Sequence, residues 1–421
     1  DNPQTPLDLN GADFRKANLS GVDLSGTQLR RAIFADADMS KVILKNASLR
    51  NAIFTNTNLF QADLSEADLS NANLTGAQIR EANLSKADLN NACLIEADLS
   101  KSILINVNLR SANLQHSDLS MTDMYEADLR SANISNSQLV SANLRHSKLE
   151  KTNFEYSDLS KTILEGTPLT HAILNKVIFK EAKLNSAIFS STFLMAIDFS
   201  RSDLCRAKFD EANLEEAIFS DADLTETILS NCNLINTKFN NATLTKANLN
   251  NANLTSSELI NADLTDASLK KAILVKSNLN EATLTNANLS QAVLTEANLS
   301  NAKLNKTTLQ RSNLENVVMT GASLLNSNIS KSNLNNASLS RCNLDQANLS
   351  ETTLKKADLS SASLIGANLG YADFRQAKMN NADFHGADLR ATIFTGCEMN
   401  SVNLLNTKWT SPKIVGAQIR V

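Results

Sequence analysis

The sequence has little of what marks several common classes of protein. Its 40 basic and 44 acidic side chains nearly balance, so it lacks the basic surface with which proteins bind nucleic acid. The longest apolar run, residues 193–197, is far too short to span a membrane. The five cysteines are spread out, which disfavours a disulfide framework. We expect no bound metal and no cofactor, because the four histidines are scattered (His116, His146, His171 and His385).

What the sequence does have is a large apolar residue at every fifth position. From Leu9 to Ile419, all 83 positions at this spacing are Leu, Phe, Ile, Met or Trp. On an α-helix a step of five residues turns a side chain by about 500°, so these residues would scatter around the helix. On a regular strand they would alternate between the two faces of the sheet. The pattern therefore disfavours both elements and predicts a repeating architecture with a corner every five residues.

Each five-residue repeat also indicates how the chain turns. Two residues before the large apolar residue, which we call the centre, the chain carries a small residue, most often Ala. Leu7, Ile197 and Pro412 are the exceptions. Ten of the 11 glycines lie two residues after a centre, where Asn is also common. Because these two residue types tolerate a positive φ, we expect a tight turn at this position.

A longer period of 20 residues indicates how many repeats make one coil. Phenylalanine recurs at centres 20 residues apart, in the sets Phe14, Phe34 and Phe54, and Phe179, Phe199, Phe219 and Phe239. Like residues stack when equivalent positions of adjacent coils lie above one another, so four repeats should form one coil. We therefore predict an all-β fold, a quadrilateral β-helix of about 21 coils. We expect residues 1–8 to lead into it and residues 9–421 to form one uninterrupted solenoid with an apolar C-terminal coil.

The repeats resemble those of the pentapeptide repeat family. The resemblance rests on quintets of the form A-(D/N)-L-x-x, as in residues 62–64, 67–69 and 72–74, and it covers essentially all 421 residues. It implies a right-handed winding, which the spacing by itself does not determine. It also implies two behaviours found in the family, namely end-to-end dimerisation through the C-terminus and binding to a type II topoisomerase by mimicry of duplex DNA.

The predicted fold disfavours an enzyme. Catalysis needs groups that converge in a concave pocket. The predicted coils have a filled core, and the five-residue frame is never interrupted by a loop that could build a cleft. Stacked carboxylates such as Asp68 and Asp88 would occur in any solenoid of this kind. We therefore expect no catalytic residues, and the function should depend on the outer surface or the ends.

One stretch of the outer surface is unusually apolar. The residue before each centre is usually Asp or Asn, but it is often apolar between residues 161 and 230. We predict a partner-binding patch there, made of Ile163, Ile173, Ile178, Ile188, Phe193 and, beside Phe193, Met195. Contiguous exposed apolar area often marks a docking surface. The alternative is that β-branched residues simply suit an extended segment.

Two further surfaces are candidates for contacts. Ile103, Ile105 and Tyr125 form a smaller apolar group on another side of the predicted coils. At the C-terminal end, the centres and their neighbours include Trp409, Ile414, Val415 and Ile419. Such an apolar last coil could cap itself, contact a further domain or pair with a second copy. The family resemblance favours the last of these, an end-to-end homodimer.

The main functional prediction is a non-enzymatic rigid scaffold or protein-interaction rod, whose protein partners the sequence does not name. The alternative is a DNA-mimicking binder of a topoisomerase such as gyrase, for which a net charge of −4 is weak. A remote alternative is ice or surface binding through a threonine array. That array consists of Thr225, Thr245, Thr265 and Thr285 and is interrupted by Asp223 and Asp263.

The sequence does not determine the cellular compartment of the protein. The chain begins at Asp1 without an initiator Met, so we expect a processed or trimmed product, and removal of a signal or a further domain is left open. Unpaired cysteines slightly favour a reducing, cytoplasmic environment over a secreted one.

Overall fold

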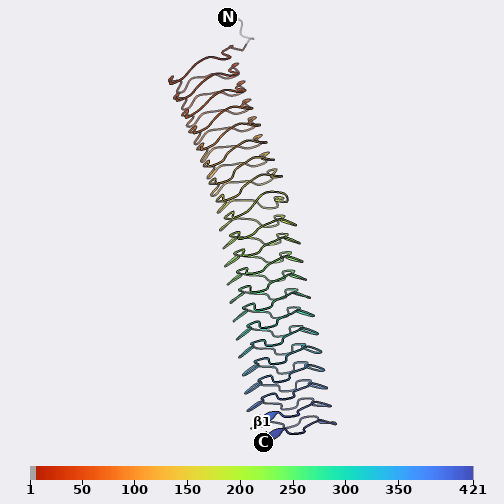
Figure 1. Ribbon diagram of the computed structural model, residues 1–421. Coiled ribbons are helices and arrows are strands. Elements are labelled where there is room, and N and C mark those ends of the chain that lie inside the picture. Colours follow the sequence, from red (N-terminus) through yellow and green to blue (C-terminus); the bar gives the residue numbers. More distant parts are fainter. Residues whose placement is uncertain (1–5, 421) are drawn as a thin grey trace. The chain divides into compact units, whose positions relative to one another are not determined.

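The protein divides into two compact units. The computed structural model describes residues 6–420; unit 1 comprises Asp1–Ala207 and unit 2 comprises Lys208–Val421. Within each unit the chain forms stacked coils that follow one another in sequence order (Figure 1). The described residues contain no helix, so the prediction of an all-β fold is confirmed. The continuation of residues 9–421 as one uninterrupted solenoid remains a prediction.

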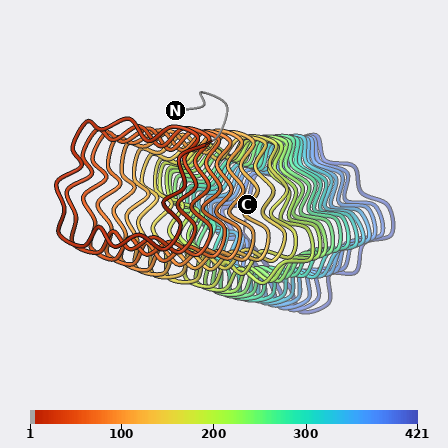
Figure 2. The same cartoon turned by 90° about the horizontal axis from the view of Figure 1, so that it is seen from above.

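Neighbouring coils pair through single bridges rather than long strands, because each side of a coil is only a few residues long. Asp68 is bridged to Asp88 and Asp88 to Asn108, both in parallel, and the same step of 20 residues recurs within both units. Among residues 6–420, one pairing extends to three residues, between β1 (Glu398–Asn400) and β2 (Gln418–Arg420). The predicted period of 20 residues is therefore confirmed. Successive coils within each unit follow the same outline (Figure 2).

Each corner of a coil is a tight turn with a regular pattern of hydrogen bonds. In the repeat around Leu64, Ala67 N–H donates to Leu64 O at 3.2 Å, and Glu66 between them has a φ of 59°. Glu66 N–H donates in turn to Ser85 O of the next coil at 2.9 Å. The positive φ predicted for Gly and Asn is found, but Glu, Lys, Ser, Arg and Tyr adopt it at the same position as well. At most corners a bond to the next coil accompanies this conformation whatever the residue type.

The centres fill the interior of each unit. Leu64 is typical, with no exposed surface. The phenylalanines stack ring on ring at the predicted spacing, with centroids 4.8 Å apart for Phe34 and Phe54 and 4.9 Å apart for Phe219 and Phe239. Such ring pairs contribute about 0.5–1.5 kcal/mol beyond the burial of their area. Each unit is therefore held together by contacts between adjacent coils.

The small inward site accepts polar residues because the backbone satisfies them. Thr57 Oγ1 donates to Phe34 O of the preceding coil at 2.7 Å, and Ser117 Oγ donates to Leu114 O of its own repeat at 2.6 Å. Ile197, one of the exceptions to the small-residue rule, is nevertheless completely buried. The corner around Ile197 must therefore accommodate three more carbon atoms than Ala supplies.

The described chain is already paired in its first coil. Leu7 O accepts a hydrogen bond from Gln28 N–H at 2.9 Å, and Asp8 is bridged to Gln28. The last residues of the predicted lead-in segment 1–8 thus pair with the second coil. Residues 1–5 of that segment lie outside the described residues.

Candidate functional site

The outward residue before each centre braces the corner that follows it. Asp68 Oδ1 accepts hydrogen bonds from Ser70 N–H at 3.1 Å and from the Ser70 hydroxyl at 2.5 Å. Asn73 holds Thr75 in the same way, at 3.1 and 2.7 Å. Asp and Asn suit this task because their short side chains carry an oxygen that reaches the N–H two residues further on. The sequence analysis missed it, although the preference for these two residue types was its signal.

One stretch of unit 1 departs from this polar pattern and forms a groove. Phe193 has 72% of its surface exposed, and Ile173, at the equivalent position one coil earlier, has 44% exposed. Met195, 43% exposed, lies beside Phe193. With His171 and Asn175 among the other lining residues, these side chains enclose a volume of ≈550 Å³. The structure therefore brings together three of the six residues predicted for the partner-binding patch.

The rim of this groove carries charge. The Lys176 ammonium group lies 5.2 Å from the centroid of the Tyr156 ring, a cation–π contact. Glu155 supplies a negative charge nearby, and its Oε1 accepts a long hydrogen bond of 3.5 Å from Asn175 Nδ2. Lys151 and Lys176 are both exposed, and neither forms an ion pair within residues 6–420. These three charged residues of unit 1, which we call the rim, thus comprise two lysines and one glutamate.

The other three residues predicted for the patch lie on other sides of the coils. A corner separates each of them from the side that carries Ile173 and Phe193, because every step of five residues leads to the next side. Ile178 is 39% exposed, whereas Ile163 and Ile188 are half-buried. The groove thus includes Ile173, Phe193 and Met195 and leaves out these three isoleucines.

The second predicted group spans two consecutive coils of unit 1. Ile103 is 44% exposed and is bridged to Asp123, while Ile105 and Tyr125 are half-buried. The Tyr125 ring packs edge-on against His146 with centroids 5.4 Å apart. This group offers less exposed apolar area than the groove.

The predicted end-to-end residues lie in the last coils of unit 2. The Trp409 ring is 36% exposed, lies 5.7 Å from the Phe394 ring and donates through Nε1 to Thr407 Oγ1 at 2.6 Å. Exposed apolar side chains nearby are Ile414, Val415 and Ile419. Their contact with a second copy remains a prediction.

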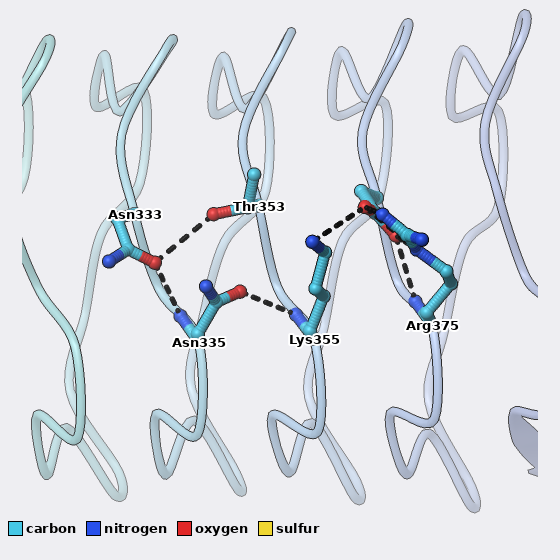
Figure 3. A network of polar contacts seen from close by, with 6 residues as sticks. Asn333, Asn335, Thr353, Lys355 and Arg375 are labelled. Carbon is cyan, nitrogen blue, oxygen red and sulfur yellow. Dashed lines mark hydrogen bonds and ion pairs between the residues drawn. The ribbon is translucent and has the colours of Figure 1, made fainter.

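A polar network on unit 2 was not predicted from the sequence. Asp373 is 8% exposed and accepts hydrogen bonds from Arg375, the shortest at 2.6 Å, while Lys355 Nζ lies 3.7 Å from the same carboxylate. Burial raises the pKa of Asp373, but the hydrogen bonds from Arg375 outweigh it and hold that pKa below its usual value. Asn335 Oδ1 accepts from Lys355 N–H at 3.0 Å and Asn333 Oδ1 from Asn335 N–H at 3.1 Å, which extends the network to earlier coils (Figure 3).

Lys355, Lys356, Arg375 and Gln376 border a shallow depression of ≈300 Å³ beside this network. One carboxylate, Asp373, faces two of these three cations, so the depression carries little unbalanced charge. The signal in the sequence was the spacing of 20 residues between Lys355 and Arg375. We assign the network to bracing the surface between coils.

Other chemistry can be stated briefly. Within residues 6–420, no three His, Cys, Asp or Glu side chains are grouped so that they could hold a metal ion. The same residues include no helix of the length and hydropathy that a membrane span requires. None of the cysteines is in a disulfide; Cys232, Cys342 and Cys397 are buried, and Cys93 and Cys205 are half-buried.

Comparison with protein families gives a match along nearly the whole chain. The matching family is described as pentapeptide repeats, and its overlapping matches run from residue 8 to residue 406. Comparison with curated protein sequences gives no match.

Three solved structures are similar to parts of this chain. HetL, a pentapeptide repeat protein involved in heterocyst differentiation regulation in the cyanobacterium Nostoc sp. strain PCC 7120, is 31% identical over 44% of this chain and 86% of HetL, with a TM-score of 0.36. A trypsin-treated form of QnrB1, a plasmid-mediated fluoroquinolone resistance protein, is 20% identical over 43% of this chain and 88% of QnrB1, with a TM-score of 0.31. A pentapeptide repeat protein from the Arabidopsis thaliana thylakoid lumen is 31% identical over 26% of this chain and 69% of its own, with a TM-score of 0.19.

Proposed function

The chain belongs to the pentapeptide repeat family, and on that premise we propose that it is a non-enzymatic interaction scaffold that docks a partner protein at the groove around Phe193. The regular coils supply a stiff support, since most corners are hydrogen-bonded to the next coil within each unit. The groove supplies the recognition surface. This assignment follows from the distribution of apolar and polar groups on the surface and not from the functions of the relatives.

The observation that carries the proposal is the exposure of Phe193. An aromatic side chain that is 72% exposed, beside Ile173 and Met195 in a groove of ≈550 Å³, is unfavourable in water. Burying a phenylalanine side chain completely contributes about 1.5–3 kcal/mol, which corresponds to roughly a tenfold to hundredfold gain in affinity. The β-branched propensity that suits an extended segment accounts for Ile173, but not for Phe193 and Met195 as neighbours of one groove.

The test compares the proteins that co-purify with the wild type and with Phe193→Asp. We expect a partner retained by the wild type to bind the variant at least about tenfold more weakly, because a buried aromatic contact is replaced by an unpaired charge. Tyr371→Asp is the matched control, since Tyr371 is 70% exposed but lies in unit 2, outside the groove. Phe193→Asp should have the same melting temperature as the wild type. Equal retention of the partner by both variants would contradict the proposal.

The alternative functions remain predictions. For a gyrase-directed DNA mimic, a supercoiling assay with the purified protein is the direct test. For the threonine array, the hydroxyl groups of Thr225 and Thr265 each donate to the aspartate two residues earlier, both at 2.6 Å. Hydroxyl groups that donate to these aspartates are less available to bind an ice lattice. A measurement of thermal hysteresis tests ice binding directly.

A further inference from the structure

The coils on either side of the groove are paired differently from the coils before them. One coil earlier, Phe154 N–H donates to Ile173 O at 2.9 Å and Tyr156 N–H donates to Asn175 O at 3.1 Å. Ile173 N–H donates back to Thr152 O at 2.9 Å, and Asn153 is bridged to Ile173. The lower edge of the groove is therefore a normally paired segment.

The upper side of the same segment is open. In the described part of the chain, Leu174 N–H makes no bond to Phe193 O, Phe193 N–H makes none to Ala172 O, and Lys176 N–H makes none to Met195 O. These are the bonds that the 20-residue step would form. The regular spacing of the ribbon is interrupted in this yellow-green region (Figure 1). Consistent with the gap, Ala172 at the small inward site is partly exposed and lines the groove.

The cause of the gap lies at the adjacent corner. Val177 and Ile197 occupy the small inward site in consecutive coils, one above the other, and both are completely or almost completely buried. Overfilling a packed site costs about 1–3 kcal/mol unless the surroundings move apart. At this corner Asp198 N–H still bonds to Val177 O, but at 3.3 Å, whereas beside Val107, which lies between Ala87 and Ala127, the equivalent bond from Asn108 N–H to Ala87 O is 3.0 Å. We infer that the stacked bulk of Ile197 on Val177 pushes the two coils apart.

An open segment of this kind exposes a row of backbone groups that need partners. The N–H and C=O groups are at strand spacing, and only another extended backbone presents matching groups in the same register. The floor of the groove is apolar, so it favours an apolar side chain on that backbone. Lys151 and Lys176 on the rim outnumber Glu155, so the rim favours an acidic residue beside that backbone.

We propose that the groove accepts an extended peptide segment of the partner protein as an added β-strand, with an apolar residue seated on Ile173, Phe193 and Met195 and an acidic residue beside the rim lysines. The inference rests on the proposed function and adds the mode of binding to it. Main-chain hydrogen bonds to Leu174 N–H and Ala172 C=O supply affinity, and the groove supplies specificity.

The first experiment measures the opening in the free protein by amide hydrogen exchange. The Leu174 and Phe193 amides should exchange much faster than the Phe154 amide one coil earlier, because their bonds are absent. Ile197→Ala should slow exchange at Leu174 and Phe193 by relieving the corner, whereas Val107→Ala, the matched control, should leave it unchanged. Protection of Leu174 equal to that of Phe154 in the wild type would overturn the inference.

The second experiment uses short linear peptides selected from a phage-displayed library on the full chain. The selected peptides should combine apolar and acidic residues and should bind Phe193→Asp about tenfold more weakly. Methylation of alternate backbone nitrogens in such a peptide should weaken binding by about the same factor, because it removes the donors of the ladder. Binding to Ile197→Ala should also weaken.

The outcomes separate the two proposals. If Phe193→Asp weakens binding but backbone methylation and Ile197→Ala do not, strand addition is wrong and docking at the groove stands. If selected peptides bind Phe193→Asp as well as the wild type, the groove is not the docking surface and both proposals fail.

Discussion

At the scale of single residues, the small inward site shows how the fold tolerates polarity in its core. A hydroxyl or thiol there donates to a backbone carbonyl of its own repeat or of the preceding coil, as Ser332 Oγ does to Leu309 O at 2.7 Å. A buried polar group without a partner costs about 1–3 kcal/mol. Within residues 6–420, Thr167 Oγ1 and Ser327 Oγ are the buried side-chain atoms without a hydrogen-bond partner. These two sites are therefore where the core is least well satisfied.

This contrast predicts opposite effects of one substitution at two positions. Ser327→Ala should raise the free energy of unfolding by about 1 kcal/mol, because it removes an unpaired buried hydroxyl. Ser332→Ala should lower it by a similar amount, since it deletes a bond to Leu309 O and leaves Ser312 N–H without its acceptor. Thermal or denaturant unfolding of both variants gives the measurement. Destabilisation by Ser327→Ala as large as by Ser332→Ala would contradict the account of the site.

Burial of the thiols predicts their reactivity. Burial raises the pKa of Cys232 and of Cys342 to about 12 and the pKa of Cys397 to about 11. Since these values lie above the usual thiol range near 8.5, the three thiols stay protonated in the folded state until the pH approaches those values. At pH 8, a thiol reagent should label Cys93 and Cys205 in the folded protein and all five cysteines after denaturation. Rapid labelling of Cys342 in the folded protein would contradict its burial.

At the scale of the repeat, the corner carries most of the conformational specificity. The residue two after each centre takes a positive φ, which is costly for a β-branched side chain and free for Gly. The corner donor also bonds to the next coil, as Ser256 N–H does to Val275 O at 2.9 Å. The backbone conformation of each repeat is thus coupled to that of its neighbour.

Substitutions at Ser256 test this coupling. Ser256 has a φ of 58° and an exposed side chain, so Ser256→Val should lower the free energy of unfolding by about 1–2 kcal/mol through backbone strain. Ser256→Gly is the matched control and should be neutral or slightly stabilising. Thermal unfolding of the pair gives the comparison. Equal stability of the two variants would show that the positive φ is not a constraint.

How far the sequence predicts these elements depends on whether a feature repeats. The centres such as Leu64, the corner and the 20-residue step follow from periodicity, because every repeat obeys the same packing rule. The opening between Ile173 and Phe193 does not, because it depends on the combined bulk of Val177 and Ile197 in two coils. Taken alone, Val177 is an ordinary residue at the small inward site, and Ile197 is one of the three exceptions to the small-residue rule. The bracing of Ser70 by Asp68 was missed for another reason, since an outward Asp is equally well explained by solvation.

At the scale of the whole molecule, both units are built from the same 20-residue coil, so each unit is a one-dimensional stack in which a coil contacts its neighbours. The net charge of −4 and the near balance of acidic and basic groups give the chain no strong overall charge to attract a partner. The docking that we propose therefore relies on a local departure from the repeat, the groove around Phe193.

The most direct test of the stacked coil is a pair of deletions within unit 2, compared by thermal unfolding. Removal of residues 251–270 takes out one coil and keeps every bridge in register, so this variant should retain the β-helix circular dichroism spectrum and melt close to the wild type. Removal of residues 251–271 leaves one repeat a residue short, so a corner cannot form and this variant should melt at a clearly lower temperature or in two steps. Coincident melting of the two deletion variants would contradict the 20-residue coil on which the whole account depends.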